Sequence, residues 1–111
     1  MTATATEAVL VLTTLSEEHD PAPFARTLVE ERLAACVNVV EPIRSFYVWE
    51  GKLSDDREQL FLIKTTRGRL DALRERLLEI HPYDTPEFVV LEMAGISEKY
   101  GAWLAAAVGS G

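Results

Sequence analysis

The stretch IHPYDTPE at residues 80–87 gathers side chains that could do chemistry. His81, Tyr83, Asp84 and Glu87 lie close together in the chain, and prolines on the same stretch restrict its backbone. A ring nitrogen, a phenol and two carboxylates can bind a cation, bind a polar ligand, or tie a loop down by hydrogen bonds. The residues themselves leave these three uses open.

A helix before this stretch and a strand after it would hold it in place. Pro82 has no backbone N–H for a continuing helix, so we expect the helix that Thr66 caps to end at His81. The strand FVVLEMA, at residues 88–94, is apolar on both faces, and Gly95 closes it. The apolar side chains of the helix recur at helical spacing, at Leu70, Leu73, Leu77 and Ile80.

The first part of the chain predicts a strand and a second amphipathic helix. The run AVLVLTT, within a strand at about residues 7–14, is aliphatic or β-branched at nearly every position, so both of its faces must be covered. Asp20 followed by Pro21 is typical of a helix N-cap and first turn. We expect this helix to run to about Ala35 and to pack on the sheet.

The middle of the chain predicts two extended segments joined by a tight turn. CVNVV at residues 36–40 and IRSFYVWE at 43–50 flank Pro42, which suits an edge or a bend, and Glu50-Gly51 suits a reversal. The acidic patch SDDRE at 54–58 is interpreted as a solvated strand end, because it lacks the ligand spacing and glycine of a calcium loop. It precedes the strand QLFLIKT. Alternation in the second segment puts one set of side chains on a single face: Ile43, Ser45, Tyr47 and Trp49.

A third helix follows Ser97, and the order of elements then defines the fold. Its expected apolar stripe comprises Tyr100, Trp103, Leu104, Ala107 and Val108. The order βαββαβ with an added C-terminal helix predicts an α+β, ferredoxin-like sandwich, with both crossover helices on one face of a four-stranded antiparallel sheet. The strands are apolar on the second face too, and the third helix is too short to cover it. We therefore expect self-association through that face.

Composition limits the classes of function. The 111 residues predict one domain, 1–111, with residues 1–6 and 109–111 frayed. A net charge of −7 without a basic run argues against nucleic acid and anionic membranes as partners. Neither a signal peptide nor a membrane-spanning run is present, so we expect a cytoplasmic protein. The single cysteine, Cys36, fits a reducing compartment and excludes a thiolate zinc cage within one chain.

Several motifs in combination resemble the CutA divalent-cation tolerance family. They are LAACVNVVEPIRSFYVWEGKL, EQLFLIKTT, HPYDTPEFVVLEM and YGAWL, and the likeness runs from Val9 to Leu104. The resemblance implies a homotrimer similar in design to the PII signalling proteins, with the sheets facing inward. It also implies a role linked to copper or other divalent cations, without an established reaction.

The resemblance further implies a polar cleft between subunits. Members that look best equipped for copper have a cysteine and a second histidine where this chain has Thr13 and Ile80. His81 would therefore be the metal ligand, no cofactor would be required, and Cu²⁺ or another divalent cation would bind weakly. Cys36 fits a buried small hydrophobe better than a ligand. The cleft residues that the resemblance implies are Tyr47, Trp49, Glu58, Lys64, His81, Tyr83 and Glu87.

Four functions remain as hypotheses. The first is a trimeric binding protein for divalent cations or a small polar ligand, and not an enzyme. The second is an enzyme of unknown reaction with His81 as general base and Lys64 and Glu87 nearby, although no pair of nucleophile and base is legible. The third is a PII-like sensor of a small anionic ligand, for which the chain has no glycine-rich phosphate loop. The fourth is a structural trimer that anchors partner proteins.

Overall fold

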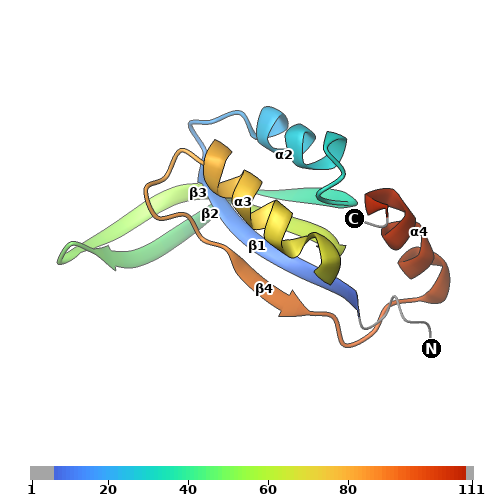
Figure 1. Ribbon diagram of the computed structural model, residues 1–111. Coiled ribbons are helices and arrows are strands. Elements are labelled where there is room, and N and C mark those ends of the chain that lie inside the picture. Colours follow the sequence, from blue (N-terminus) through green and yellow to red (C-terminus); the bar gives the residue numbers. More distant parts are fainter. Residues whose placement is uncertain (1–6, 110–111) are drawn as a thin grey trace.

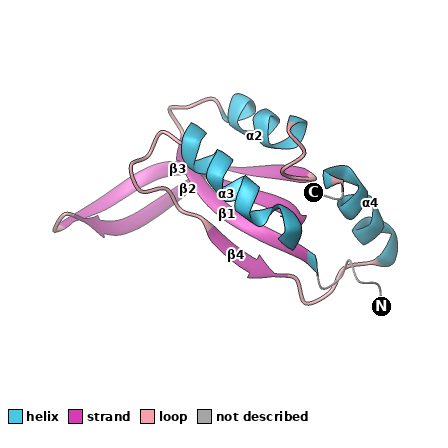
Figure 2. Ribbon diagram, viewed as in Figure 1, coloured by secondary structure: helices cyan, strands magenta, loops and turns pink. Residues whose placement is uncertain are grey.

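The protein is an α+β sandwich built on one antiparallel sheet (Figures 1 and 2). The computed structural model describes residues 7–109. The strand order is β2-β3-β1-β4, and helices α2 and α3 lie together on one face of the sheet. The predicted βαββαβ order with an added C-terminal helix is confirmed. The elements are β1 (Ala8–Ser16), α2 (Pro21–Glu30), β2 (Cys36–Trp49), β3 (Lys52–Thr66), the 3-10 turn η1 (Arg67–Arg69), α3 (Leu70–Ile80), β4 (Val89–Glu92) and α4 (Glu98–Val108).

The main core lies between the sheet and helices α2 and α3. Between Val9 and Leu15 of β1, and between Gln59 and Thr65 of β3, alternate residues point toward the helices and are at most 2% exposed. On this face the ring of Phe24 from α2 meets the ring of Phe61 edge-on, with centroids 5.0 Å apart. The buried cluster includes Val11, Phe61 and Ile63 from the strands, Leu28 from α2, and Leu73 and Leu77 from α3.

The opposite face of the sheet, which we call the open face, has little cover. Strand register places Leu10 beside Leu91, and Leu12 beside Val89 and Leu62, so these apolar side chains share that face. Val89 and Leu91 are 43% and 44% exposed. The predicted apolar second face is therefore present and largely uncovered within one chain.

Helix α4 covers one end of the open face, and its packing differs from the prediction. Leu104 and Val108 are buried against Ala8 and Ala35, as expected. Tyr100 and Trp103 were assigned to the same stripe but are exposed, and they pack on each other with centroids 5.3 Å apart. A helix that lies on a sheet buries one stripe of side chains, and the two aromatic rings of α4 fall outside that stripe.

Several predicted boundaries were wrong by a few residues. Asp20 caps α2 through its carboxylate, which accepts from the backbone N–H of Ala22, but the helix ends at Glu30 and not at Ala35. Arg32 has a positive φ of 59°, and Leu33 N–H returns to the carbonyl of Leu28, which closes the helix. Strand β4 is confined to Val89–Glu92, shorter than residues 88–94.

The predicted N-caps of two helices were only partly right, whereas the predicted end of α3 is confirmed. The side chains of Thr66 and Ser97 make no capping hydrogen bond, and Thr66 precedes η1 rather than α3. His81 is the C-cap of α3 with an extended backbone, which confirms the helix end predicted before Pro82. The expectation of frayed ends falls on residues 1–6 and 110–111, outside the described residues, whereas Gly109 caps α4.

Strands β2 and β3 form a long hairpin that projects beyond the rest of the molecule (Figure 1). The chain reverses at Glu50 and Gly51, whose φ angles are 50° and 80°, so Trp49 pairs with Lys52 as the predicted tight turn requires. The pairing of β2 with β3 shifts register between Val40 and Ile43, at the position where Pro42 predicted a bend. Among residues 7–109, no helix is long and apolar enough to span a membrane.

Candidate functional site

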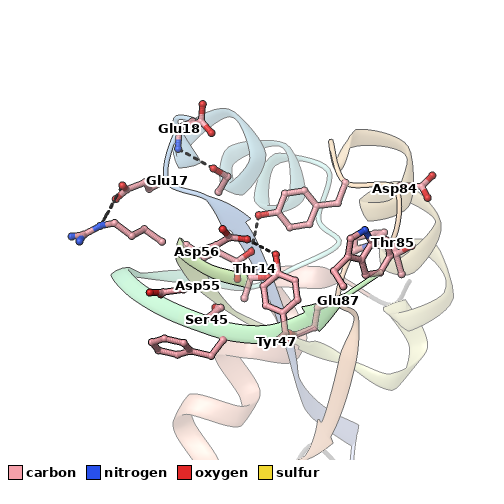
Figure 3. A pocket seen from close by; sticks show the side chains of 17 residues that line it. Thr14, Glu17, Glu18, Ser45, Tyr47, Asp55, Asp56, Asp84, Thr85 and Glu87 are labelled. Carbon is pink, nitrogen blue, oxygen red and sulfur yellow. Dashed lines mark hydrogen bonds and ion pairs between the residues drawn. The ribbon is translucent and has the colours of Figure 1, made fainter. Parts of the chain in front are cut away.

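An open depression lies where the hairpin leaves the body of the sheet (Figure 3). Its wall is supplied by the end of β1, the hairpin as far as Trp49, and the loop after α3. Residues that are far apart in the sequence therefore meet in one place. Five of the seven predicted cleft residues line it: Tyr47, Trp49, Glu58, Tyr83 and Glu87.

Glu58 and Tyr83 form the buried centre of the site. The phenol of Tyr83 donates a 2.6 Å hydrogen bond to Oε2 of Glu58, and Glu58 is only 6% exposed. Burial and this carboxylate together raise the pKa of Tyr83, so its hydroxyl stays protonated and donates. The interpretation of residues 54–58 as a solvated strand end is wrong for Glu58. Strand β3 begins at Lys52, and Glu58 pairs with Ser16 inside the sheet.

Tyr47 and Asp56 form a second phenol–carboxylate pair beside the first. Register places Ser45 opposite Asp56 and Tyr47 opposite Ser54, so these side chains share one face of the hairpin. The phenol of Tyr47 donates to the carboxylate of Asp56, and this bond raises the pKa of Tyr47 (Figure 3). Two neutral phenols are thus held against two carboxylates in the same depression.

The wall of the depression carries an excess of negative charge. Arg57 is the one basic residue among the described residues that line it, and its guanidinium pairs with Glu17 at 3.3 Å. Asp55 is paired with Arg44, whose hydrogen bond lowers the pKa of Asp55. Within residues 7–109, no ion pair with a basic side chain is shown for the remaining lining carboxylates: Glu18, Asp56, Glu58, Asp84 and Glu87.

His81 lies behind the depression and does not line it. Its Nε2 is 2.7 Å from the carbonyl of Thr14, and the backbone N–H of Tyr83 donates to its Nδ1 at 3.1 Å. A carbonyl can only accept, so the ring is neutral with its proton on Nε2. Burial lowers the pKa of His81, which favours this neutral form. The structure thus shows the third use left open by the sequence, the tying down of the loop.

Lys64 is the other predicted cleft residue that lies elsewhere. It shares a face of β3 with Glu58 but is six residues further along, about 20 Å at the rise of a β-strand. Its ammonium group is 3.4 Å from the hydroxyl of Tyr100 and lies over that ring, 5.6 Å from the centroid. Within one chain, Lys64 is therefore separate from the group around Glu58.

Sequence reasoning missed two contributors to the site. The position of Asp56 was legible, because a two-residue turn at Glu50 and Gly51 puts it opposite Ser45. The carbonyl of Thr14 carried no side-chain signal. Strand β4 pairs with β1 only as far as Leu12, so the Thr14 carbonyl is not bonded by β4. The ring of His81 bonds to it instead.

The described residues contain no group of three or more histidine, cysteine, aspartate or glutamate side chains placed to hold a metal ion. Cys36 is half-buried in β2, opposite Lys64 and at the other end of the sheet from Glu58. A metal bound in the depression would thus depend on carboxylate and phenol oxygens, with further ligands from outside one chain.

Comparison with known proteins agrees with this architecture. The model of the family described as CutA1 divalent ion tolerance protein matches residues 9–107. The divalent-cation tolerance protein CutA of Thermus thermophilus is 44% identical over 95 residues, which cover 86% of this chain and 92% of that protein. The chloroplastic CutA of Arabidopsis thaliana is 42% identical over 86% of this chain, which spans only 53% of that relative.

Solved structures show the same fold over nearly the whole length. The crystal structure of CutA1 from Oryza sativa superposes with a TM-score of 0.90 at 38% identity, covering 98% of this chain and all of that one. The PII-like protein CutA from Nostoc sp. PCC 7120 superposes with a TM-score of 0.82 at 35% identity, with 91% and 97% of the two chains covered. On these likenesses and on the matched family model, the chain belongs to the CutA1 divalent ion tolerance protein family.

Proposed function

We propose that the protein is a homotrimeric binding protein, and not an enzyme, that takes up a divalent cation or a small positively charged ligand in clefts between its subunits. The observation that carries this proposal is the depression at the base of the hairpin. Its wall is rich in carboxylates without basic partners, and the buried Glu58 lies at its centre. Such a wall attracts positive charge and disfavours anions.

The uncovered open face supports assembly. Leu10, Leu12 and Leu62 lie side by side on it, and β4 adds Val89 and Leu91. A contiguous apolar surface of this kind on a monomer is unusual, and association with copies of the same chain would cover it. The depression continues along the face of the hairpin, so neighbouring subunits could close it into a cleft.

Oxygen ligands set the expected order of metals. Carboxylates such as Asp56, Glu58 and Glu87 suit hard divalent cations, while Cu²⁺ heads the affinity order among first-row divalent metals for oxygen and nitrogen sites. We expect weak binding with Cu²⁺ ahead of Zn²⁺. The names of the relatives, which refer to tolerance of divalent cations, are consistent with a cation of this class.

The other functions receive less support. A sensor of an anionic ligand would have to overcome the negative wall of the depression. An enzyme that used His81 as general base would need a free ring nitrogen, and both are bonded to backbone groups. A location in the cytoplasm stays a proposal, since two plant relatives are named as chloroplastic proteins.

Native mass spectrometry and a thermal-shift screen test the proposal together. We expect a trimer, and a rise in melting temperature with Cu²⁺ but not with ATP. A ligand at 100 times its dissociation constant adds about 2.7 kcal/mol of stability. Glu58→Gln and Asp56→Asn should each reduce the Cu²⁺ shift, while Asp71→Asn, at an exposed carboxylate on α3, is the matched control. A monomer, or stabilisation by ATP alone, would contradict the proposal.

A further inference from the structure

We propose that His81 is a positioning residue that fixes Tyr83 through its Nδ1, and through Tyr83 fixes the carboxylate of Glu58. This inference rests on the proposed function for the identity of the ligand, but its geometry belongs to one chain. His81 is bonded to the edge of β1 and to the backbone of Tyr83, and the side chain of Tyr83 is bonded to Glu58 in the depression.

The first link anchors the ring in the sheet. Nε2–H donates to the carbonyl of Thr14, so the other nitrogen, Nδ1, must present its lone pair on the far side of the ring. The rings of Phe24 and Tyr83 contact the imidazole edge-on, with centroids 5.6 Å and 4.6 Å away. Hydrogen bond and packing together leave the ring one orientation.

The second link holds the backbone of the loop. The N–H of Tyr83 donates to Nδ1, while Pro82 restricts the backbone between the two residues. The position of the Tyr83 main chain is therefore set from β1 and not from the loop itself. A loop that crosses between α3 and β4 gains a fixed point in this way.

The third link reaches the ligand site. Tyr83 is the hydrogen-bond partner shown for Glu58 within residues 7–109, and Glu58 is almost completely buried. A buried carboxylate without a partner costs free energy, so displacement of Tyr83 would shift Glu58 or change its ionisation. In metal sites, loss of an outer partner of a ligand typically reduces affinity about 10–100-fold.

The same bonds argue against direct ligation by His81. A metal needs a lone pair on a ring nitrogen, but Nδ1 already accepts from Tyr83 and Nε2 carries the proton given to Thr14. Ligation through Nδ1 would break the bond that holds Tyr83. His81 thus acts on the site through Tyr83 and does not contact the ligand itself.

Two substitutions separate the two ring nitrogens. In His81→Asn, the side-chain carbonyl oxygen falls near the position of Nδ1 and can accept from Tyr83. In His81→Gln, the amide nitrogen falls near the position of Nε2 and can donate to Thr14, without the acceptor for Tyr83. The matched control is His19→Asn, which removes the other imidazole of the chain, on the exposed β1–α2 connection.

Two readouts are measured on the full-length protein: hydrogen exchange of the Tyr83 amide by NMR, and Cu²⁺ affinity by calorimetry. We expect His81→Asn to keep the Tyr83 amide protected and to bind Cu²⁺ within about threefold of the wild type. His81→Gln should lose the protection and bind Cu²⁺ about 10–100-fold more weakly. His19→Asn should match the wild type in both. Circular dichroism and native mass spectrometry establish that each variant is folded.

The opposite pattern overturns the proposal. Equal loss of Cu²⁺ affinity in His81→Asn and His81→Gln, with the Tyr83 amide still protected in His81→Asn, would make His81 a ligand. A protected Tyr83 amide in His81→Gln would show that Nδ1 does not hold the loop. If the wild type binds no Cu²⁺, the exchange pattern alone still supports or overturns the positioning role, and only the proposed function fails.

Discussion

The two faces of the sheet are made of similar residues but have different surroundings. On the helix face, Phe61 and Ile63 of β3 are completely buried under α2 and α3. On the open face, their neighbours Leu60 and Leu62 are only half-buried, although they are equally apolar. Because successive side chains of a strand point to opposite faces, one strand reports on both environments. Apolar character thus predicts that a face needs cover, and the structure shows which cover the chain itself supplies.

The helix face should respond most strongly to truncation. We expect Phe61→Ala to lower the free energy of unfolding by about 3–5 kcal/mol, because it removes the ring that packs on Phe24 and leaves a cavity. Guanidinium unfolding at fixed protein concentration measures the change. A loss below about 1 kcal/mol would mean that the core under α2 and α3 can collapse around the gap.

The open face should respond almost as strongly if other subunits cover it. We expect Leu62→Ala to cost about 2–5 kcal/mol and to weaken the trimer in native mass spectrometry, because a buried leucine leaves a cavity at the interface. The wild-type melting temperature should also rise with protein concentration. A small loss together with a melting temperature that ignores a hundredfold dilution would show that the face stays exposed.

Two threonines on the helix face should respond in opposite directions. Thr65 Oγ1 donates a 2.7 Å hydrogen bond to the carbonyl of Leu33, whereas Thr13 Oγ1 is buried with no partner shown within residues 7–109. We expect Thr65→Val to lower the free energy of unfolding by about 1–3 kcal/mol, and Thr13→Val to leave it unchanged or raise it. Chemical denaturation of the two variants side by side checks the sign, and equal losses would contradict it.

The smallest expected effect concerns pH. Burial lowers the pKa of His81; His19 also lowers it, while the Thr14 carbonyl and Glu58 act in the opposite direction. The unfolded chain then binds the proton more readily, so the stability from neutral His81 is full above pH 6.5 and is lost as pH falls through the lowered pKa.

This contribution changes the free energy of unfolding by at most about 1.4 kcal/mol per pH unit. His81→Asn should have a flatter stability curve than the wild type between pH 7 and pH 5, because it removes the ring whose pKa differs between the folded and unfolded chain. Denaturant unfolding across this range measures the two curves, and identical slopes in the variant and the wild type would contradict the assignment.

The order of the helices and strands could be predicted from the sequence, whereas the ends of several elements and the burial of some side chains could not. Pro82 correctly marked the end of α3 because proline removes a backbone donor, a purely local effect. The end of α2 was missed because a positive φ at Arg32, a residue with no preference for it, stops the helix. Glu58 was misjudged because its burial depends on the Tyr83 loop, far away in the chain. The separation of Lys64 from the site likewise follows from strand length and not from residue type.

The turn at Glu50 and Gly51 sets the face of the hairpin on which each aromatic side chain lies. Both residues have positive φ, a geometry that accepts two residues and no more, and this count sets the pairing of every residue in the hairpin. A slip of one position would turn Tyr47 to the opposite face of the hairpin and remove the phenol that donates to Asp56. The turn at the tip thus helps to set the polarity of the site, so an insertion or deletion there would change which hairpin side chains face the depression without altering any residue in it.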